Sequence, residues 1–215
     1  MIRLRDRRRP GQEDFAVETP GAPSVSFWGE QPPLAYTAAL RALASCVAST
    51  VRLLQQRRIH LPAGWVGKQL GFADGTSARV YRETVVDRDA PQEPCVLVVA
   101  FRLRAVRGRG HAMFRWESLL NTPLFVGFPG FVSKLWLAND DRGRYRGVYQ
   151  WDGPRRADHY ARALWRVLAL VSVRGSIHYA VLPGLRRDEL LRQPEILAEV
   201  ATADASAWWR LTQVA

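Results

Sequence analysis

Residues 130–151 read GFVSKLWLANDDRGRYRGVYQW, and this stretch decides the fold. Both of its halves are rich in aromatic residues, as is typical of strands. Residues 139–143, between the halves, combine Asn, Asp, Arg and Gly, which is the composition of a tight turn. The stretch therefore predicts a β-hairpin whose two strands both carry aromatic side chains.

The segments around this hairpin extend it into a larger unit. Residues 95–104 have the apolar run of a strand buried on both faces, and residues 176–182 predict a closing strand. Helices are expected at 111–121 and from Pro154 to about residue 174, where apolar residues recur every three or four positions. The resulting order, β-α-β-β-α-β, predicts a ferredoxin-like α+β core over residues 95–185.

The stretch PGFVSKLWLANDDRGRYRGVYQWDG, residues 129–153, resembles the YdhR-type monooxygenases of the dimeric α/β-barrel superfamily. The similarity lies in Pro129-Gly130, Lys134 with Trp136, Gly143, Gly147-Val148-Tyr149 and Trp151-Asp152. The resemblance covers roughly residues 95–185 and implies a sheet that pairs with its copy in a second subunit, with a cavity between sheet and helices. That superfamily includes cofactor-free oxygenases of anthrone-like compounds, haem-degrading enzymes, isomerases and proteins without known catalysis.

The remainder of the chain is expected to surround this core. Residues 1–31 are basic and contain proline, which predicts a flexible segment. Residues 32–94 predict an annex of one helix and a β-hairpin turning at Asp74-Gly75, and residues 186–215 predict a helical tail. The annex helix carries an apolar stripe that is expected to pack on the sheet, at a dimer seam or on a partner protein: Tyr36, Leu40, Leu43, Val47, Val51 and Leu54.

Composition limits the class of protein. The chain has 215 residues and a formal charge of +11, and 29 of its 31 basic residues are Arg. Five of these lie in the first nine residues, so the charge predicts no specific nucleic-acid site. The apolar stretch 35–54 is interrupted by Arg41 and Arg52, which makes it too polar for membrane insertion. Two isolated cysteines and no secretory signal predict a soluble, cytoplasmic protein.

Metal and cofactor chemistry has little support in the sequence. The sequence has no phosphate-binding loop and no nucleophile elbow. Its four histidines are far apart and have no metal-binding spacing: His60, His111, His159 and His178. We therefore expect neither a metal nor another cofactor. Haem binding, as a minor alternative, would need His111, His159 or His178 as its axial ligand.

Acid/base chemistry in an apolar pocket fits the residues better. Such a site needs a proton acceptor and a group that stabilises negative charge on oxygen. The candidate catalytic residues are His178 as the base, Lys134 beside Trp136 and Glu83 as the carboxylate. For each there is a plain structural alternative: a core histidine, a lysine reaching the sheet edge, and an exposed ion pair. The candidate substrate-binding residues are Trp136, Tyr149, Trp151, Tyr145, His111, Arg115 and Asn121.

These features lead to one function and several alternatives. The first expectation is a homodimeric, cofactor-independent monooxygenase that acts on an aromatic or polyketide-like compound. A non-redox cyclase or isomerase could use the same scaffold. A protein that binds a small apolar or aromatic ligand without catalysis is the alternative from a different class.

Overall fold

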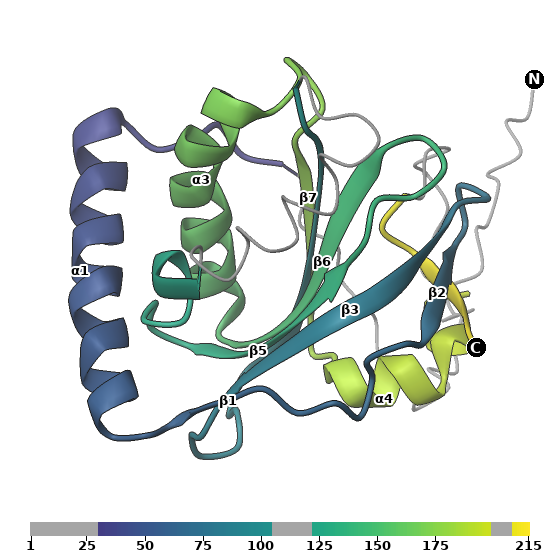
Figure 1. The fold of residues 1–215 in the computed structure, drawn as a ribbon, viewed down its shortest axis with the longest axis horizontal. Coiled ribbons are helices and arrows are strands. Elements are labelled where there is room, and N and C mark those ends of the chain that lie inside the picture. The colour runs from purple at the N-terminus through teal and green to yellow at the C-terminus, as the bar shows by residue number, and fades with distance from the viewer. Residues whose placement is uncertain (1–29, 105–121, 199–207) are drawn as a thin grey trace, which may run out of the picture.

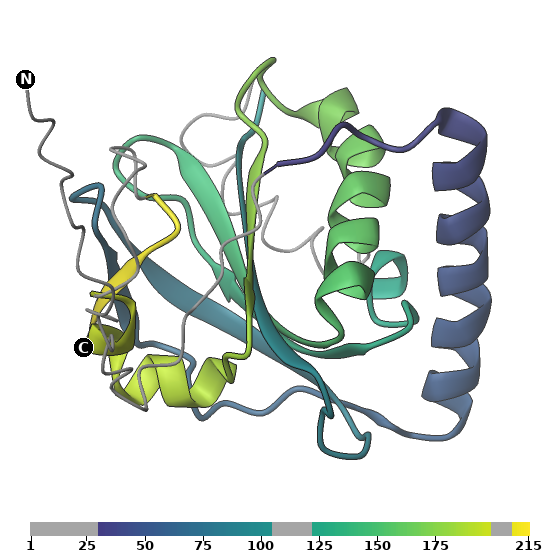
Figure 2. The ribbon, with the colours of Figure 1, turned by 180° about the vertical axis from the view of Figure 1, so that it is seen from behind.

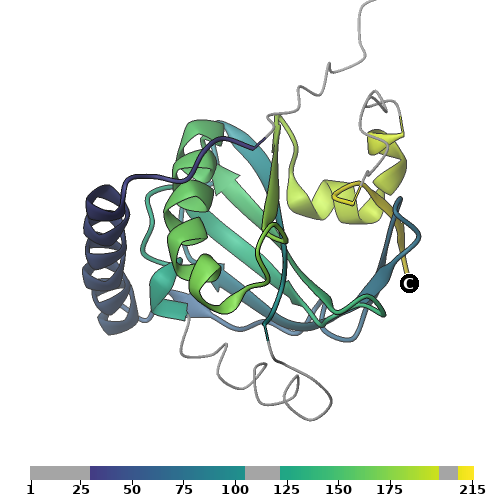
Figure 3. The ribbon, with the colours of Figure 1, turned by 90° about the horizontal axis from the view of Figure 1, so that it is seen from above.

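A computed structural model describes residues 30–104, 122–198 and 208–215 of the chain. Its main element is an eight-stranded sheet in the order β7-β4-β6-β5-β3-β2-β8, with the short β1 paired to β3. Every neighbouring pair is antiparallel. The sheet curls into half a barrel, which is clearest from above (Figure 3).

The strands are β1 (Ile59–His60), β2 (Gln69–Phe72), β3 (Ser77–Val86), β4 (Pro94–Arg102), β5 (Phe131–Leu137), β6 (Arg144–Asp152), β7 (His178–Pro183) and β8 (Leu211–Val214). The α-helices in the described ranges are α1 (Tyr36–Gln55), α3 (Pro154–Val171) and α4 (Arg187–Arg192). Two short 3-10 helices, η1 (Thr122–Leu124) and η2 (Pro194–Leu197), complete the described elements.

The helices divide between the two faces of the sheet. Helix α3 packs against β4, β6 and β7, and α1 packs outside it against α3 and η1 (Figure 1). Helix α4 contacts β6 and β8 on the opposite face, as the view from behind shows (Figure 2). Two separate apolar clusters result, one under α3 and one under α4. The sheet is therefore buried on both faces along most of β4, β5 and β6.

The central hairpin forms as predicted. Strands β5 and β6 pair along their length, with Lys134 opposite Tyr149 and Trp136 opposite Gly147. In the turn, Asp140 Oδ1 accepts hydrogen bonds from the backbone N–H groups of Arg142 and Arg144. Gly143 has φ of +71°, a conformation that favours glycine. The local sequence is therefore sufficient to specify this hairpin.

The predicted ferredoxin-like fold is wrong, although the mixed α+β class fits. The prediction treated residues 32–94 as an annex of one helix and a β-hairpin packed on a four-stranded ferredoxin-like core, although it expected the sheet to have more than four strands. Instead β3 pairs with β5 from Val80 to Val85, and β2 and β8 continue the sheet beyond it. Strand pairing between distant segments, which local pattern does not encode, converts the expected four-stranded core into half a barrel. The helix expected at 111–121 lies outside the described residues.

The predicted C-terminal helical tail is also wrong at residues 211–214, which form a strand. Helix α4 ends at Arg192, η2 follows, and residues 211–214 form β8, paired with β2. The edge of β2 offers backbone hydrogen bonds that an isolated helical turn would not supply, so tertiary context overrides the local pattern. Trp208 and Trp209, just before β8, are both buried in the cluster under α4.

Helix α1 forms where predicted, but it buries a different face. Its buried residues are Ala39, Leu43, Cys46, Thr50 and Leu53. Of the predicted apolar stripe only Leu43 is buried, while Tyr36 is 64% and Leu40 is 66% exposed. Small side chains on the buried face let the chain after η1 come close, and Cys46 Sγ and Thr50 Oγ1 both donate hydrogen bonds to the Pro123 carbonyl oxygen. The close approach of the chain after η1 therefore decides which face of α1 is buried.

This close approach depends on Gly127. A Cβ atom there would collide with the Cys46 carbonyl oxygen and lie 2.7 Å from the Thr50 nitrogen. We expect Gly127→Ala to destabilise the protein by about 1–3 kcal/mol, because α1 must move away. Gly64→Ala is the matched control, since a Cβ atom at Gly64 meets nothing within 4 Å. Urea unfolding of both variants checks this, and equal midpoints would contradict the contact.

Helix α1 is the one helix in the described ranges that is long and apolar enough to cross a membrane by length and composition. In the structure 28% of that span is buried. A single helix of this kind is weak evidence for insertion, because the core helices of soluble proteins have the same properties.

Candidate functional site

A cavity of about 670 Å³ lies between the sheet and helix α3. Strands β3 to β6 supply one wall, while Leu164, Val167 and Leu168 of α3 supply the other. Its volume is in the range of small-molecule sites, and its lining is mainly apolar and aromatic. We call it the aromatic cavity, after the rings of Tyr81, Phe125, Trp136, Tyr145, Tyr149 and Tyr160 that line it.

The alternation of side chains along a strand places the amine of Lys134 in this cavity. Side chains alternate across a strand, so Lys134 and Trp136 share one face of β5, as Tyr145 and Tyr149 share one face of β6. The β5–β6 register brings these two faces to the same side of the sheet, because Lys134 lies opposite Tyr149. Gly147, opposite Trp136, has no side chain, and a Cβ atom there would lie 2.7 Å from the Tyr149 ring.

Lys134 is the one lysine in this apolar environment, and it is buried. Its Nζ atom lies 3.1 Å from the ring centroid of Trp136, 4.5 Å from that of Phe125 and 4.8 Å from that of Tyr149. Among the described residues no carboxylate forms an ion pair with it. Aromatic rings therefore replace the usual anionic partner.

Two opposing effects set the protonation of this amine. Cation–π contacts favour the ammonium by about 2 kcal/mol when desolvated. Removing an ion from water costs several kcal/mol, and the charge of Arg82, whose guanidinium carbon lies 3.8 Å from the Trp136 ring centroid, adds repulsion. Burial first and Arg82 second hold the pKa of Lys134 well below its ordinary value of 10.5. The amine is thus far more available as a base or nucleophile than an exposed lysine.

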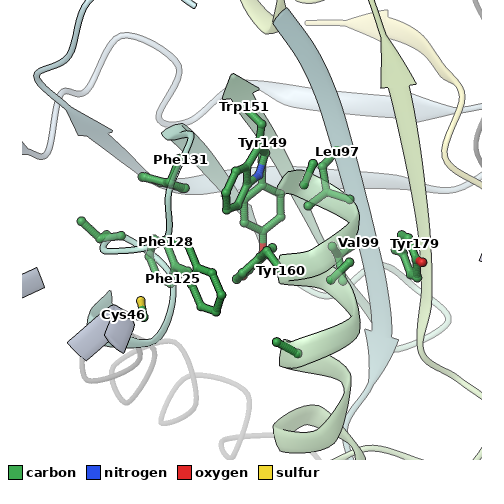
Figure 4. Packing of buried hydrophobic residues seen from close by; sticks show 14 of the residues in the cluster. Cys46, Leu97, Val99, Phe125, Phe128, Phe131, Tyr149, Trp151, Tyr160 and Tyr179 are labelled. Carbon is green, nitrogen blue, oxygen red and sulfur yellow. The ribbon is translucent and has the colours of Figure 1, made fainter. Parts of the chain in front are cut away.

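Two phenols lie beside the amine. The Tyr160 hydroxyl donates a hydrogen bond to the Tyr149 hydroxyl at 3.3 Å, and both rings lie between α3 and the sheet (Figure 4). Burial raises the pKa of both hydroxyl groups, so each keeps its proton at neutral pH. Because Tyr149 accepts from Tyr160, its own proton is available to an oxygen atom of a bound compound.

The indole of Trp136 is fixed in orientation. Its Nε1 donates a 3.1 Å hydrogen bond to Thr84 Oγ1 on the neighbouring strand, and its ring contacts that of Phe125 edge-on at 5.1 Å. Because both the Nε1 atom and the ring of Trp136 are held in place, this side chain forms a rigid part of the cavity wall. Such rigidity favours a binding site that is already formed before a compound binds.

Four of the residues predicted from the sequence meet in the aromatic cavity: Lys134, Trp136, Tyr145 and Tyr149. Trp151 lies behind its wall, where it packs against Phe131 and Tyr160 with ring centroids 5.6 and 4.9 Å apart. His111, Arg115 and Asn121 lie outside the described residues. The question of which strand faces line the cavity, open at the level of sequence, is therefore answered for β5 and β6.

The other two predicted catalytic residues lie elsewhere. His178 points away from the cavity on β7, its side chain is 36% exposed, and its Nδ1 atom is 2.7 Å from Glu30. Tyr179, the next residue, belongs to the cluster under α3, so strand alternation directs His178 to the opposite face. Glu83 is buried on the α4 side, in an ion pair of 2.6 Å with Arg187. Neither side chain reaches the candidate site.

Sequence reasoning missed Arg82 and gave Tyr160 only a structural role. Tyr160 belongs to the apolar face of the helix at 154–171, and an aromatic hydroxyl on such a face was a usable signal. Arg82 lies over the ring of Trp136, with its guanidinium carbon 3.8 Å from the ring centroid, and the β3–β5 register shifts between Val80 and Arg82. That irregularity leaves no mark in the sequence pattern.

Metal and thiol chemistry have no support in the described part of the chain. No group of three His, Cys, Asp or Glu residues is placed there to hold a metal ion. Burial raises the pKa of the Cys46 thiol to about 11 and that of Cys95 to about 12, which makes both poor nucleophiles. Of the three histidines considered for haem, His159 is exposed on α3 and His178 lies outside the cavity.

Comparisons with known proteins leave the resemblance to YdhR-type monooxygenases as a prediction. No protein-family model matches this chain, and a search of the curated proteins gives no match either.

Proposed function

We propose that this protein is an enzyme acting on a small aromatic or polyketide-like compound, and that its first step is proton transfer to the amine of Lys134. The observation that supports this most is the buried Lys134, whose Nζ atom contacts aromatic rings at the wall of the aromatic cavity. The lowered pKa of this amine favours its neutral form, which is the form that a general base requires.

The proton transfer follows from the geometry. A phenolic or activated carbon acid in the cavity gives its proton to Nζ, which leaves a phenolate or enolate and a lysine ammonium. The rings of Trp136, Phe125 and Tyr149 surround the new cation and stabilise it. The Tyr149 hydroxyl donates to the anionic oxygen, and this charge-assisted hydrogen bond is strong in a dry cavity.

Two outcomes can follow from the same anion. In cofactor-independent monooxygenation, dioxygen is the co-substrate: a ring CH₂ group becomes a carbonyl, one oxygen atom enters the product and the other leaves as water. In cyclisation or isomerisation the proton returns from Lys134 to another atom, and no oxygen is consumed. Monooxygenation is the first proposal, and the second outcome is its alternative.

Oxygen uptake on anthrone and 1-naphthol tests this function. We expect wild-type protein and Lys68→Met to consume dioxygen with at least one probe, and Lys134→Met to lose about 10²-fold or more, the usual contribution of a general base. Lys68 is the exposed second lysine and so the matched control. Conversion without oxygen uptake supports the isomerase alternative. Tight binding with no conversion by any of the proteins overturns the enzyme proposal in favour of a ligand-binding protein.

We also propose that the protein is a soluble, cytoplasmic homodimer. Helix α1 presents a row of large apolar side chains to solvent, at spacings typical of a helix that packs against a second helix: Tyr36, Leu40, Val47, Val51 and Leu54. Two buried free cysteines fit a reducing compartment. Native mass spectrometry gives the subunit number and the mass of any retained compound, and a monomer at micromolar concentration contradicts the dimer.

A further inference from the structure

A second hollow, of about 710 Å³, lies at the C-terminal end of α1, away from the aromatic cavity. Segments from four parts of the chain form it: the last turns of α1, the β3–β4 connection, the chain before β5, and the junction of β6 with α3. Four arginines line it and we call it the arginine pocket: Arg52, Arg58, Arg88 and Arg156.

The acidic side chains of this pocket do not balance its arginines. Among the described residues, Asp89 and Asp152 are the acidic side chains that line it beside the four guanidinium groups. Asp152 is already engaged, because its Oδ1 atom accepts the backbone N–H groups of Gln92 and Glu93 at 2.9 Å, and its Oδ2 atom accepts Arg156 at 3.1 Å. An excess of positive charge therefore remains in a concave site.

Arg88 is the arginine of this pocket whose buried donor atom has no partner among the described residues. Its side chain is partly buried, and its Nε atom is fully buried with no hydrogen-bond partner. Burial, and then the charges of Arg58 and Arg156, lower its pKa below the ordinary value. A buried donor without a partner costs about 1–3 kcal/mol, so the fold tolerates a group that a bound acceptor would satisfy.

The start of α3 adds to the positive potential. The helix begins at Pro154 with no acidic residue in its first turn and no side-chain cap, and Arg155 and Arg156 occupy that turn instead. A helix N-terminus carries a partial positive charge and normally attracts acidic residues. Arginine is unfavourable there, and Asp152, which already accepts two backbone N–H groups, is the carboxylate that pairs with Arg156 in the pocket.

We propose that the arginine pocket binds the phosphate group of a phosphate ester. Planar guanidinium groups donate pairs of hydrogen bonds that match phosphate oxygens, and a dianion neutralises the excess charge of several arginines at once. The remaining volume accommodates the rest of a small ester. The site is separate from the aromatic cavity and does not depend on the chemistry of Lys134.

Thermal unfolding and calorimetry with inorganic phosphate test this site. At equal ionic strength, we expect phosphate to raise the Tm of the wild type saturably over chloride, as binding to the folded state requires. In Arg58→Gln/Arg88→Gln the affinity for phosphate should fall at least tenfold. The Tm of this variant in chloride should not decrease, because the substitution removes repulsion, and this separates lost binding from lost folding.

Arg41→Gln/Arg174→Gln, which removes two exposed arginines outside the pocket, is the matched control and should bind phosphate as the wild type does. Sedimentation with phosphatidylcholine/phosphatidylglycerol vesicles identifies the source of the phosphate. Vesicle binding that requires Arg58 and Arg88 assigns a lipid headgroup, whereas phosphate binding without vesicle binding assigns a soluble ester. Equal effects of phosphate and chloride, or equal phosphate affinity in both double variants, overturn the proposal.

Discussion

Lys134→Met protein is expected to unfold at a higher temperature than the wild type. Methionine has nearly the same length as lysine and fills the same apolar space, but it has no amine to remove from water. The buried amine has aromatic rings and no carboxylate around it among the described residues. The expected gain is about 1–3 kcal/mol. For a chain of this size it corresponds to roughly 2–4 °C in Tm for each kcal/mol.

The gain should depend on pH in a definite direction. The pKa of Lys134 is lower in the folded protein than its ordinary value of 10.5, so between these two pKa values the unfolded chain binds a proton that the folded chain does not. Wild-type stability therefore rises with pH in that window, by up to about 1.4 kcal/mol per pH unit. Lys134→Met lacks this dependence, and its advantage should be largest at low pH and shrink towards pH 10.5.

Urea unfolding from about pH 6 to about pH 9 measures both effects, with Lys68→Met as the control for removal of an exposed lysine. A stability difference between Lys134→Met and wild type that stays constant across the range would mean that Lys134 is charged in the folded state. Loss of stability on substitution would mean that the rings hold an ammonium more strongly than burial opposes it. Either result contradicts the neutral base of the proposed mechanism.

Arg146→Met should have the largest destabilising effect of any single change described here, about 3–5 kcal/mol. The Arg146 side chain is completely buried and pairs with Asp140 at 2.7 Å and Asp74 at 2.8 Å. Its Nη2 also donates to Thr76 Oγ1, and its Nε to the Trp208 carbonyl oxygen. Removal of the guanidinium leaves the buried Asp140 without its counter-ion, leaves Asp74 with Arg144 alone, and removes the link between Asp74 in the β2–β3 turn and Asp140 in the β5–β6 turn.

Arg144→Gln is the matched control, because Arg144 pairs with the same Asp74 at 3.0 Å but its side chain is 23% exposed. We expect it to lose less than about 1 kcal/mol. Burial alone would raise the pKa of Asp74, but hydrogen bonds from Thr76 and the charges of Arg146 and Arg144 outweigh this and lower it. The network therefore stabilises the protein above pH 3.8 and loses this contribution as the pH falls through the folded pKa. Equal urea midpoints for Arg146→Met and Arg144→Gln would contradict this account.

The features that the sequence predicted well are local. The β5–β6 hairpin depends on a turn of five residues, and the shared face of Lys134 and Trp136 depends only on the two-residue period of a strand. The register between these two strands was left open by the sequence, and the structure supplies it by placing Lys134 opposite Tyr149. The most informative part of the candidate site therefore follows from about twenty consecutive residues.

The features that sequence reasoning missed depend on distant segments. Nothing in residues 77–86 specifies that β3 will pair with β5, and nothing in residues 211–214 specifies a strand until β2 is beside it. On α1 the apolar stripe suggested the packing face, but the small residues around Cys46 decided it, because Gly127 approaches there. His178 lies outside the aromatic cavity for a simpler reason: alternation along β7 directs its side chain to the face of the sheet opposite Tyr179.

The pairing of β8 with β2 also bears on how the protein is made. Strand β8 consists of residues 211–214, and its partner β2 of residues 69–72, so the two are separated by most of the chain. During synthesis β2 and β3 leave the ribosome long before β8 exists, and the edge of β2 stays unpaired throughout that time. Unpaired edges favour association between nascent chains. We infer that the pairing of β8 with β2 is a late step of folding, and that the chain is exposed to association through the edge of β2 until this step is complete.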